Sequence, residues 1–542
     1  MESIFNQVLN LKYKINMKKQ IIIALLAITT IFGCKKDVDL TVKGISLSKS
    51  SLSLKPGDTA TLVSTILPLN ATNKAVTWAS SDTTIAKVAN GLITAIKPGS
   101  TTITATSVEK MEIATCSITV SNNDPITATG SVEGVWKKYS TVNVTGHINV
   151  PAGKTLKIEE GVEIIIATGG VDANKTKIEF IVNGNLYAVG TKAAPIKFTI
   201  PAAERTAANT FGRAWGGIIG STTCAEMLLD NVIVEHTGAT TTAASPSSVA
   251  GLFKAAGGEN MVAFNTNNPN GKYVVTNSIF RSNGEDAIYV QGGSCIFTNN
   301  LFYACGEAGG EAINCKAGTK VDAAGNIMFS PNTNGFKLSN AGASASRPQA
   351  QINAYNNTII NAGWRRDPSK PKGGSVWLEA GVLAYVYNNL IVNSMFASKA
   401  PGFGVNATTG PDLNSKIDYN FYASGSQKST IPQHVTNKTV TAFDGFQAGV
   451  VDVVRGTNDI FSASAGDATK DPKFVNFPLN TVDVTSFTFD QAWDFRLQTG
   501  SPALTGAKTN FTPFFSATGL TLNGKEYKSP APAAYFGAKG TN

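Results

Sequence analysis

The chain has 542 residues, 51 of them glycine, and only 15% of its residues are charged. This composition, with few segments of helical period, argues against a mainly helical protein and favours a β-rich exported one. The formal net charge is +9, but no run of lysine and arginine has the density or the aromatic interleaving of a nucleic-acid surface. We therefore expect no nucleic-acid partner.

The N-terminal segment, residues 1–34, predicts an export signal. Residues 17–34 combine two lysines with an apolar run of about 12 residues and end in Gly33-Cys34. A run of this length is too short to span roughly 30 Å of hydrocarbon, which disfavours a transmembrane helix.

The end of this segment, Ile31-Phe-Gly-Cys34, resembles a bacterial lipobox. The resemblance implies cleavage before Cys34 and acylation of its thiol, and acyl chains contribute about 0.8 kcal/mol of membrane binding per buried CH₂. We therefore expect a lipoprotein of the outer membrane, anchored through Cys34 and exposed at the cell surface. Met17 is then the favoured start, with residues 1–16 as an upstream extension, and Met1 is the alternative. An ordinary secretory signal with a chance cysteine is the competing interpretation.

Short alternating strands separated by turns fill residues 42–121 and predict a β-sandwich. The stretch VTWASSDTTIAKVANGLITAIKPGSTTITAT closely resembles the bacterial Ig-like group 2 module. The resemblance implies a spacer or adhesive module rather than a catalyst, with Trp78 as the core anchor and turns at Asn90-Gly91 and Pro98-Gly99. Residues 122–135 are expected to form a polar linker.

A repeated phrase then dominates the chain. One or two polar residues followed by an apolar pair restart about every 22 to 32 residues, at Asn277, Asn299, Gly325, Asn356, Asn388 and Tyr419. A β-rich repeat of this size predicts a solenoid, in which each coil buries its apolar face only against its neighbours. The asparagines of the phrase are expected to adopt left-handed turns and to hydrogen-bond to their own backbone.

The ends of the repeat region carry a family likeness. GHINVPAGKTLKIEEGVEIII resembles the opening coils of right-handed parallel β-helix proteins of the pectin-lyase-like superfamily, and DPKFV at 471–475 with GSPA at 500–503 resembles their closing phrase. We therefore predict an all-β fold, an Ig-like β-sandwich followed by a right-handed parallel β-helix. The β-helix is placed at residues 136–480, and residues 481–542 are expected to form a C-terminal closing segment.

The register of the coils follows from their inward apolar pairs, Ile288/Val290, Ile313/Cys315, Phe336/Leu338 and Val376/Leu378. This alignment predicts three outward groups: Tyr289, Asn314, Lys337 and Trp377; Gln291, Lys316, Ser339 and Glu379; and Asp286, Glu311 and Asn334. It also places Cys295 and Cys315 at inward positions, where a cysteine behaves as a small buried apolar residue. Because the cysteines left after Cys34 are odd in number and no metal-ligand spacing is present, we expect neither a disulfide framework nor a metal site.

Two carboxylates and two lysines on one patch suit the cleavage of acidic polysaccharide by β-elimination. One lysine would neutralise the sugar carboxylate, and a second lysine with a lowered pKa would remove the α-proton. The order Glu311, Lys316, Lys337 resembles the acid, lysine and arginine order of β-helical alginate and chondroitin lyases. The resemblance implies Lys316 as the base, Lys337 in place of the arginine, and a bound Ca²⁺, although a carboxylate that the family uses for calcium is missing at Gly309.

Two other functions remain open on the same scaffold. Asp286 and Glu311 could serve inverting glycoside hydrolysis, which needs carboxyl groups about 6.5–9.5 Å apart. Our primary hypothesis is instead a lipid-anchored, monomeric surface protein that binds glycan or another surface polymer without catalysis or cofactor, with Tyr289 and Trp377 stacking on sugar rings. In the lyase or hydrolase alternative the catalytic candidates are Lys316, Lys337, Glu311 and Asp286. An adhesin that recognises protein is the third class.

Overall fold

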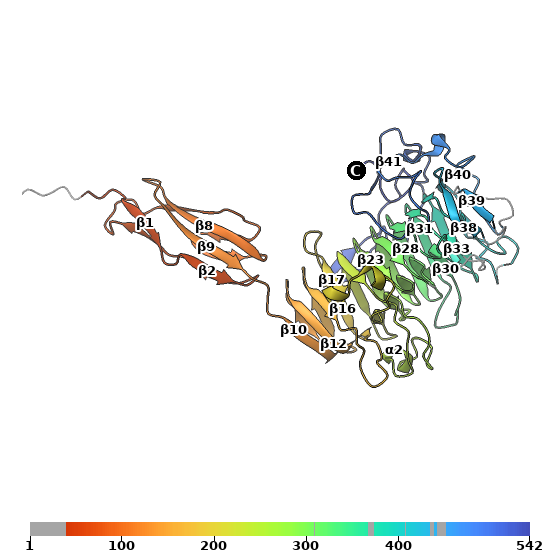
Figure 1. Ribbon diagram of the computed structural model, residues 1–542, viewed down its shortest axis with the longest axis horizontal. Coiled ribbons are helices and arrows are strands. Elements are labelled where there is room, and N and C mark those ends of the chain that lie inside the picture. Colours follow the sequence, from red (N-terminus) through yellow and green to blue (C-terminus); the bar gives the residue numbers. More distant parts are fainter. Residues whose placement is uncertain (1–38, 308, 367–372, 407, 434–437, 442–450) are drawn as a thin grey trace, which may run out of the picture. The chain divides into compact units, whose positions relative to one another are not determined.

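The computed structural model describes residues 39–307, 309–366, 373–406, 408–433, 438–441 and 451–542 (Figure 1). The chain divides into two compact units, with the boundary between Asn122 and Asn123. Cys34 and the rest of the predicted export signal lie outside the described residues. Within the described part, no helix has the length and apolar character needed to cross a bilayer.

The first unit is an antiparallel-rich β-sandwich. Its strands are β1 (Gly44–Leu47), β2 (Ser51–Leu54), β3 (Thr59–Thr61), β4 (Ser64–Leu67), β5 (Val76–Ser80), β6 (Ala86–Ala89), β7 (Leu92–Ala95), β8 (Gly99–Ser107) and β9 (Ile113–Val120). They form sheets β2-β9-β8-β5, β3-β7-β6 and β1-β4. Trp78 packs against the core cluster that includes Ile93 and Ile103, as predicted. The predicted turn at Asn90-Gly91 requires glycine, because a Cβ at Gly91 would lie 2.4 Å from the Leu62 carbonyl oxygen.

The second unit is a parallel β-helix in which successive coils contribute one strand to each of three series. The first series contains β15 (Phe180–Val182), β18 (Ile218–Gly220), β21 (Phe264–Thr266), β24 (Ile288–Val290), β27 (Ile313–Cys315), β30 (Asn334–Ser339) and β33 (Gly374–Glu379). The second contains β11 (Gly134–Trp136), β13 (Thr155–Ile158), β16 (Asn185–Val189), β19 (Glu226–Asp230), β22 (Lys272–Thr276), β25 (Gly293–Thr298), β28 (Thr319–Ala324), β31 (Gln351–Tyr355), β34 (Leu383–Tyr387) and β36 (Lys416–Ile417). The third contains β14 (Glu163–Ile166), β17 (Ile196–Thr199), β20 (Val232–Glu235), β23 (Ile279–Asn283), β26 (Leu301–Cys305), β29 (Ile327–Phe329), β32 (Thr358–Ile360), β35 (Leu390–Val392), β37 (Phe421–Ala423) and β40 (Ile460–Phe461). The predicted all-β fold with a parallel β-helix is confirmed.

The two ends of this unit differ from the expected boundaries. The expected linker at residues 122–135 holds β10 (Ile126–Ser131), which pairs in parallel with β12 (Thr141–Val150) and buries Ala128. A segment that adds a rung to a sheet is part of the fold, so its polar composition was misleading. At the other end, β41 (Phe474–Asn476) already pairs antiparallel with β42 (Asp494–Leu497), within the closing part of the chain.

The inward register of the coils is the predicted one. Ile288 pairs with Ile313, Ile313 with Phe336 and Phe336 with Val376, and all four side chains are buried. Cys295 stacks below Val321 in the second series, and Cys315 lies between Val290 and Leu338 in the first. Both cysteines are free and buried, which confirms their prediction as small core residues.

The paired asparagines of the repeated phrase have two separate roles. The first member adopts the predicted left-handed conformation, with φ of 52° at Asn277, 57° at Asn299 and 59° at Asn388. The second position forms a buried ladder through Asn300, Asn326, Asn357, Asn389 and Asn420, in which each Nδ2 donates to Oδ1 of the next coil at 2.9–3.0 Å. This ladder satisfies amide groups inside the turn, where an unpaired polar group would be costly.

The C-terminal segment covers two of the three outer faces in the middle coils. On the second series, the buried carboxylate of Asp322 accepts hydrogen bonds from Phe514 N at 3.2 Å, Phe515 N at 2.9 Å and Ser529 Oγ at 2.7 Å. On the third series, an aromatic cluster forms in which the Phe329 ring lies 5.0 Å from that of Trp493. On the outer face of the first series, polar side chains of consecutive middle coils lie in register.

Candidate functional site

One outward column runs along the first series. Its members in order are Ile181, Ile219, Asn265, Tyr289, Asn314, Lys337 and Trp377. The predicted succession from Tyr289 to Trp377 is confirmed as a geometric column. Its beginning is covered, because Ile181 and Ile219 pack against Phe253 from the insertion between β20 and β21. The polar part of the column starts beyond this covering.

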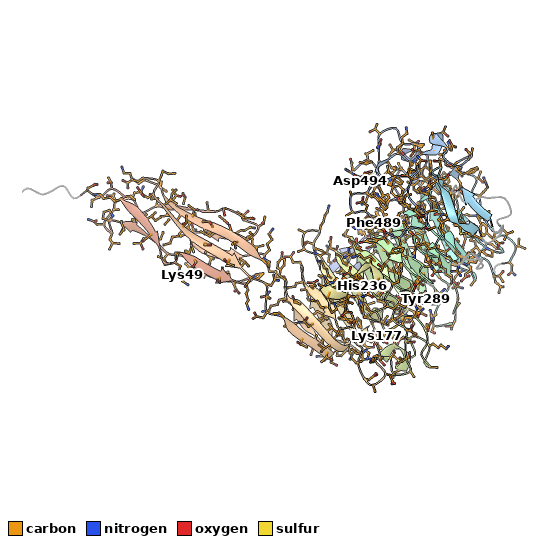
Figure 2. The ribbon with its side chains drawn as sticks, in the orientation of Figure 1. Lys49, Lys177, His236, Tyr289, Phe489 and Asp494 are labelled. Atoms are coloured by element: carbon orange, nitrogen blue, oxygen red, sulfur yellow. The ribbon has the colours of Figure 1, made fainter. Side chains whose placement is uncertain are left out.

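Trp377 closes the other end of the polar part. It is only 6% exposed, and its Nε1 donates to Glu379 Oε2 at 2.7 Å. Residue 399 pairs beside it as a further rung, with Lys399 Nζ 5.6 Å from the indole centroid. A ring this deeply covered presents no face to a sugar, so the predicted stacking role does not fit Trp377. Tyr289, labelled in Figure 2, remains partly exposed.

Asp286 and Glu311 form a buried acid pair beneath this face. They are 4% and 7% exposed and are hydrogen-bonded to each other. Asp286 Oδ1 accepts from the Glu311 backbone N at 2.8 Å, and Oδ2 accepts from Asn314 Nδ2 at 2.9 Å. Burial and the charge of Glu311 raise the pKa of Asp286 well above its ordinary value. Asp286 therefore holds the proton of the pair.

Glu311 is the ionised partner. Burial alone would raise its pKa, but the hydrogen bond from Asp286 and the charges of Lys337 and Lys316 outweigh burial and lower the pKa of Glu311. Two carboxyl groups in direct hydrogen-bond contact leave no room for the water that an inverting glycosidase places between groups about 6.5–9.5 Å apart. The predicted spacing for hydrolysis is therefore wrong.

A third carboxylate, which the sequence interpretation missed, lies beside this pair. A Cβ at Gly309 would lie 1.4 Å from Glu285 Oε1, so Glu285 fills the space that a side chain at position 309 would occupy. Burial raises the pKa of Glu285, and Asn260 Nδ2 donates to its Oε2 at 3.1 Å. The carboxylate that the lyase likeness lacks at Gly309 is thus present in space from the preceding coil.

These acids do not make the ligand set of a divalent cation. Among the residues that the structure describes, no three histidine, cysteine, aspartate or glutamate side chains converge as metal ligands do. The lone pairs of Asp286 are already used by backbone and amide donors, and its raised pKa keeps it protonated. These residues therefore do not fit the Ca²⁺ that the lyase likeness implies.

Lys316 and Lys337 lie on adjacent coils above the acid pair, and both side chains are partly exposed. Burial and the neighbouring charge of Lys337 lower the pKa of Lys316 to about 8. Burial alone would lower the pKa of Lys337. The negative charges of Glu311 and Glu379 outweigh this effect of burial and raise the pKa of Lys337 above its ordinary value. Lys337 Nζ is 3.6 Å from Glu379 Oε1, and Lys316 Nζ is 5.5 Å from the Tyr289 ring centroid. One lysine is therefore permanently charged and the other titrates near neutral pH.

Arg347 adds a third cation that the sequence interpretation missed. It comes from the turn between β30 and β31, and its Nη2 donates to the carbonyl oxygens of Gln291 at 2.8 Å and Ala317 at 3.1 Å. Gln291 follows β24 directly and Ala317 lies two residues beyond β27, so the guanidinium lies past the ends of these two strands, where Lys316 also lies. Tyr289, Lys316, Lys337 and Arg347 are called the lysine face below.

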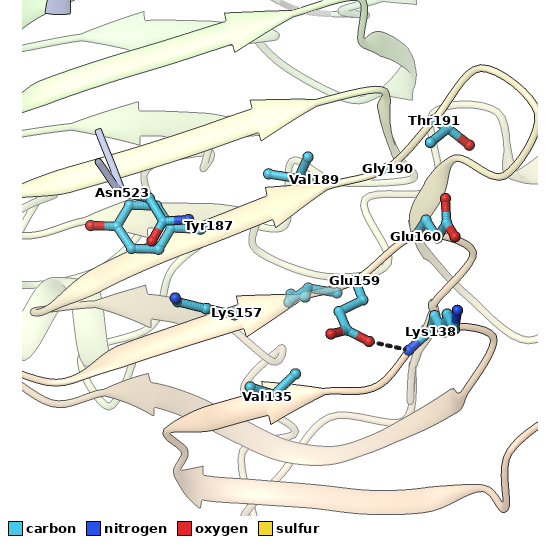
Figure 3. A pocket seen from close by; sticks show the side chains of 11 residues that line it. Val135, Lys138, Lys157, Glu159, Glu160, Tyr187, Val189, Gly190, Thr191 and Asn523 are labelled. Atoms are coloured by element: carbon cyan, nitrogen blue, oxygen red, sulfur yellow. Dashed lines mark hydrogen bonds between the residues drawn. The ribbon is translucent and has the colours of Figure 1, made fainter. Parts of the chain in front are cut away.

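A separate hollow of about 470 Å³ lies on the second series near the start of the β-helix (Figure 3). Lys157 and Tyr187 line it, and Lys138 N donates to Glu159 Oε2 at 2.9 Å on its rim. The Tyr187 hydroxyl is bound to Glu226 Oε2 at 2.7 Å. The hollow is lined by both lysine and glutamate side chains, so it does not bring cations together as the lysine face does.

Comparison with known proteins gives one family match and several partly similar relatives. Residues 41–118 match the bacterial Ig-like domain (group 2). An uncharacterized protein of Clostridium acetobutylicum is 40% identical over 92 residues, 17% of this chain and 9% of that protein. An α-L-arabinofuranosidase of Bifidobacterium longum is 41% identical over 68 residues, 12% of this chain and 6% of the enzyme. A second uncharacterized Clostridium acetobutylicum protein is 43% identical over 79 residues, 14% of this chain and 20% of that protein.

The chain thus spans a fifth or less of the length of these curated relatives. The predicted bacterial Ig-like module is confirmed.

Proposed function

We propose that this protein binds an acidic polysaccharide at the bacterial cell surface through the lysine face. The observation that carries the proposal is the placement of Lys316, Lys337 and Arg347 on one outward face of consecutive coils. Successive coils are about 4.8 Å apart, so the cations form a row that can follow the charged groups of an extended polymer. Partial burial strengthens each charge–charge contact relative to open water.

The Ig-like module supports a location outside the cell, where it would act as a spacer. We propose that acylated Cys34 anchors the protein in the outer membrane, that the β-helix belongs to the pectin-lyase-like superfamily, and that the protein acts as a monomer. The similarity to part of an α-L-arabinofuranosidase supports a glycan-related role. The alternative partner, a surface protein rather than a glycan, is less well matched by a row of lysines beside an aromatic ring.

The proposed anchor has a direct test. Changing Cys34 to alanine removes the thiol that would be acylated, so the variant is expected to stay unacylated and to remain in the aqueous phase of a detergent partition. The unchanged protein should enter the detergent phase with lipid attached. A Cys34→Ala protein that still carries lipid would contradict the anchor.

Elimination is the second candidate activity, and the two different lysine pKa values favour it. Lys337, with its raised pKa, would neutralise the carboxylate of a uronate residue. Lys316, with a pKa of about 8, would accept the proton α to that carboxylate. The electron pair left on carbon would form the new double bond as the glycosidic oxygen departs with the electrons of the broken C–O bond and takes a proton from water. Binding requires only the cations, whereas elimination requires Lys316 in its neutral form.

Binding and elimination can be measured on one panel of polymers. The full chain is titrated with alginate, chondroitin sulfate, polygalacturonate and neutral dextran by calorimetry, and the ultraviolet absorbance of unsaturated product is followed in parallel. Lys316→Ala and Lys337→Ala each remove one charge-assisted contact, so each is expected to weaken binding of the preferred acidic polymer by about tenfold. Dextran should not bind.

Lys157→Ala is the matched control, because it removes an exposed lysine from the second series, away from the lysine face. It should leave affinity unchanged. Equal binding of dextran, or equal losses in the Lys157 and Lys316 variants, would contradict a specific lysine face. Product absorbance that disappears in Lys316→Ala would establish elimination in addition to binding.

A further inference from the structure

A second polar cleft lies on the outer face of the third series, away from the lysine face. Its volume is about 290 Å³, and it is lined by the strands β20, β23 and β26 and by the insertion between β17 and β18. The polar residues that the argument uses are Arg205, Thr206, Thr210, His236, Arg281 and Tyr303. Figure 2 labels His236.

The floor of this cleft is a stack of polar side chains from consecutive coils. Glu235 pairs in register with Arg281, and Arg281 pairs with Tyr303. Both carboxylate oxygens of Glu235 are occupied, because Oε1 accepts from the Thr199 hydroxyl and Oε2 accepts from Arg281 Nε at 2.5 Å. Glu235 is 3% exposed and therefore fixes Arg281 from below rather than meeting a ligand itself.

The guanidinium groups keep donors for a ligand. Arg281 uses Nε for Glu235 and Nη1 for the Tyr303 hydroxyl, at 3.0 Å. Arg205 uses Nε for the Ile200 carbonyl at 2.7 Å and Nη2 for Glu163 at 2.9 Å. Within the described part of the chain, this leaves Arg281 Nη2 and Arg205 Nη1 as donors. Two guanidinium N–H groups lining one cleft suit a carboxylate, the planar anion that arginine recognises best.

His236 supplies an acceptor. Its Nδ1 lies 3.1 Å from the carbonyl oxygen of Asn209, which can only accept, so Nδ1 carries the hydrogen. Burial lowers the pKa of His236, so the ring is neutral at pH 7. Nε2 therefore holds a lone pair, which can accept a hydrogen bond from a ligand hydroxyl. The hydroxyls of Thr206 and Thr210 add groups that can donate or accept.

We propose that this cleft binds a single hydroxylated carboxylate, of the size and chemistry of one uronate residue, independently of the lysine face. The carboxylate lies against Arg205 and Arg281, and the ring hydroxyls bond to His236 Nε2 and the two threonines. Glu235 and Glu163 each pair with one of the two guanidinium groups, so the cleft offers a carboxylate directional N–H donors rather than an excess of positive charge. A neutral sugar would offer Arg281 Nη2 and Arg205 Nη1 no ionised acceptor, so its hydrogen bonds there would be weaker.

The test uses the full chain and two monosaccharide probes, glucuronate and glucose, titrated by ligand-observed NMR. Glucuronate should bind saturably and glucose at least about tenfold more weakly, because a guanidinium contact with a charged group is a strong hydrogen bond. Ala207→Trp should fill the cleft from its exposed rim, and Arg205→Gln should remove one donor. Each change should raise the Kd for glucuronate by about tenfold or more.

Ala203→Trp is the control for added bulk, since Ala203 is exposed on the same insertion but does not line the cleft. It should bind glucuronate as the unchanged protein does, and so should the double variant Lys316→Ala, Lys337→Ala. Three results would each overturn the proposal: no saturable glucuronate binding, binding that survives both Ala207→Trp and Arg205→Gln, or binding lost only in the lysine double variant. If Ala207→Trp does not fold, Arg205→Gln decides alone.

Discussion

Raising the pH from 7 to 9 should weaken binding of an acidic polysaccharide to the lysine face by about fivefold. It should speed elimination, where it occurs, by about tenfold. Lys316 is the reason, because its pKa is lowered to about 8. The protonated fraction of such a group falls from roughly nine tenths to one tenth over this interval, and the neutral fraction rises by the same amount. Binding uses the first form and proton abstraction the second.

The other groups of the face leave this sign unchanged. Lys337 stays charged, because Glu311 and Glu379 raise its pKa. Uronate carboxylates and sulfates are ionised over the whole interval. Any loss of the proton held by Asp286 would add negative charge beneath the face and would weaken anion binding further.

The pH experiment therefore separates the two functions. Affinity is measured by calorimetry and initial elimination rate by absorbance at several values between pH 7 and 9, for the unchanged protein and for Lys316→Ala. The variant should bind weakly with little pH dependence, because it lacks the titrating group. A flat affinity profile in the unchanged protein would contradict Lys316 as the titrating cation. A rate that falls with pH would contradict its role as base.

The outward column that contains Tyr289 and Lys337 was predictable, because inward apolar pairs fix the register of a coil. A shift of one residue would turn Ile313 and Cys315 outward, so the sequence specifies which residues face out. The burial of Trp377 was not predictable in this way. It depends on Lys399, which follows a strand of the third series and adds a rung beside Trp377. The repeated phrase does not occur at Lys399, so the pairing of Lys399 with Trp377 could not be predicted from the repeat.

Side-chain contacts between different coils also could not be predicted from the sequence of each coil alone. Glu285 replaces the missing side chain at Gly309 from the coil before, and Arg347 reaches back from a turn of variable length. The cleft of the third series did leave a signal. Arg281 and Tyr303 each follow the apolar pair of the repeated phrase directly, so extending the alignment by one position would have placed them in one column.

Replacing Asn300 with alanine should destabilise the β-helix by about 2–4 kcal/mol, and the same change at the adjacent Asn299 should cost only about 1 kcal/mol. Asn300 is 1% exposed, and its Nδ2 donates to the Val275 carbonyl at 2.9 Å and to Asn326 Oδ1 at 3.0 Å. Its Oδ1 accepts from Ser278 N at 3.0 Å. Alanine leaves the buried Ser278 amide and Val275 carbonyl without these partners.

Asn299 is the matched control because it has the same side chain in the same turn but is exposed, with φ of 57°. Its replacement costs only the strain of alanine in the left-handed region, where a Cβ approaches the following carbonyl oxygen. Urea unfolding followed by circular dichroism measures both losses, as shifts in midpoint at constant slope. A solenoid couples each coil to its neighbours, so the Asn300 loss should also appear as faster amide exchange at Ser278 on the preceding coil. Equal losses in the two variants would mean that the exposed turn, and not the buried ladder, stabilises the stack.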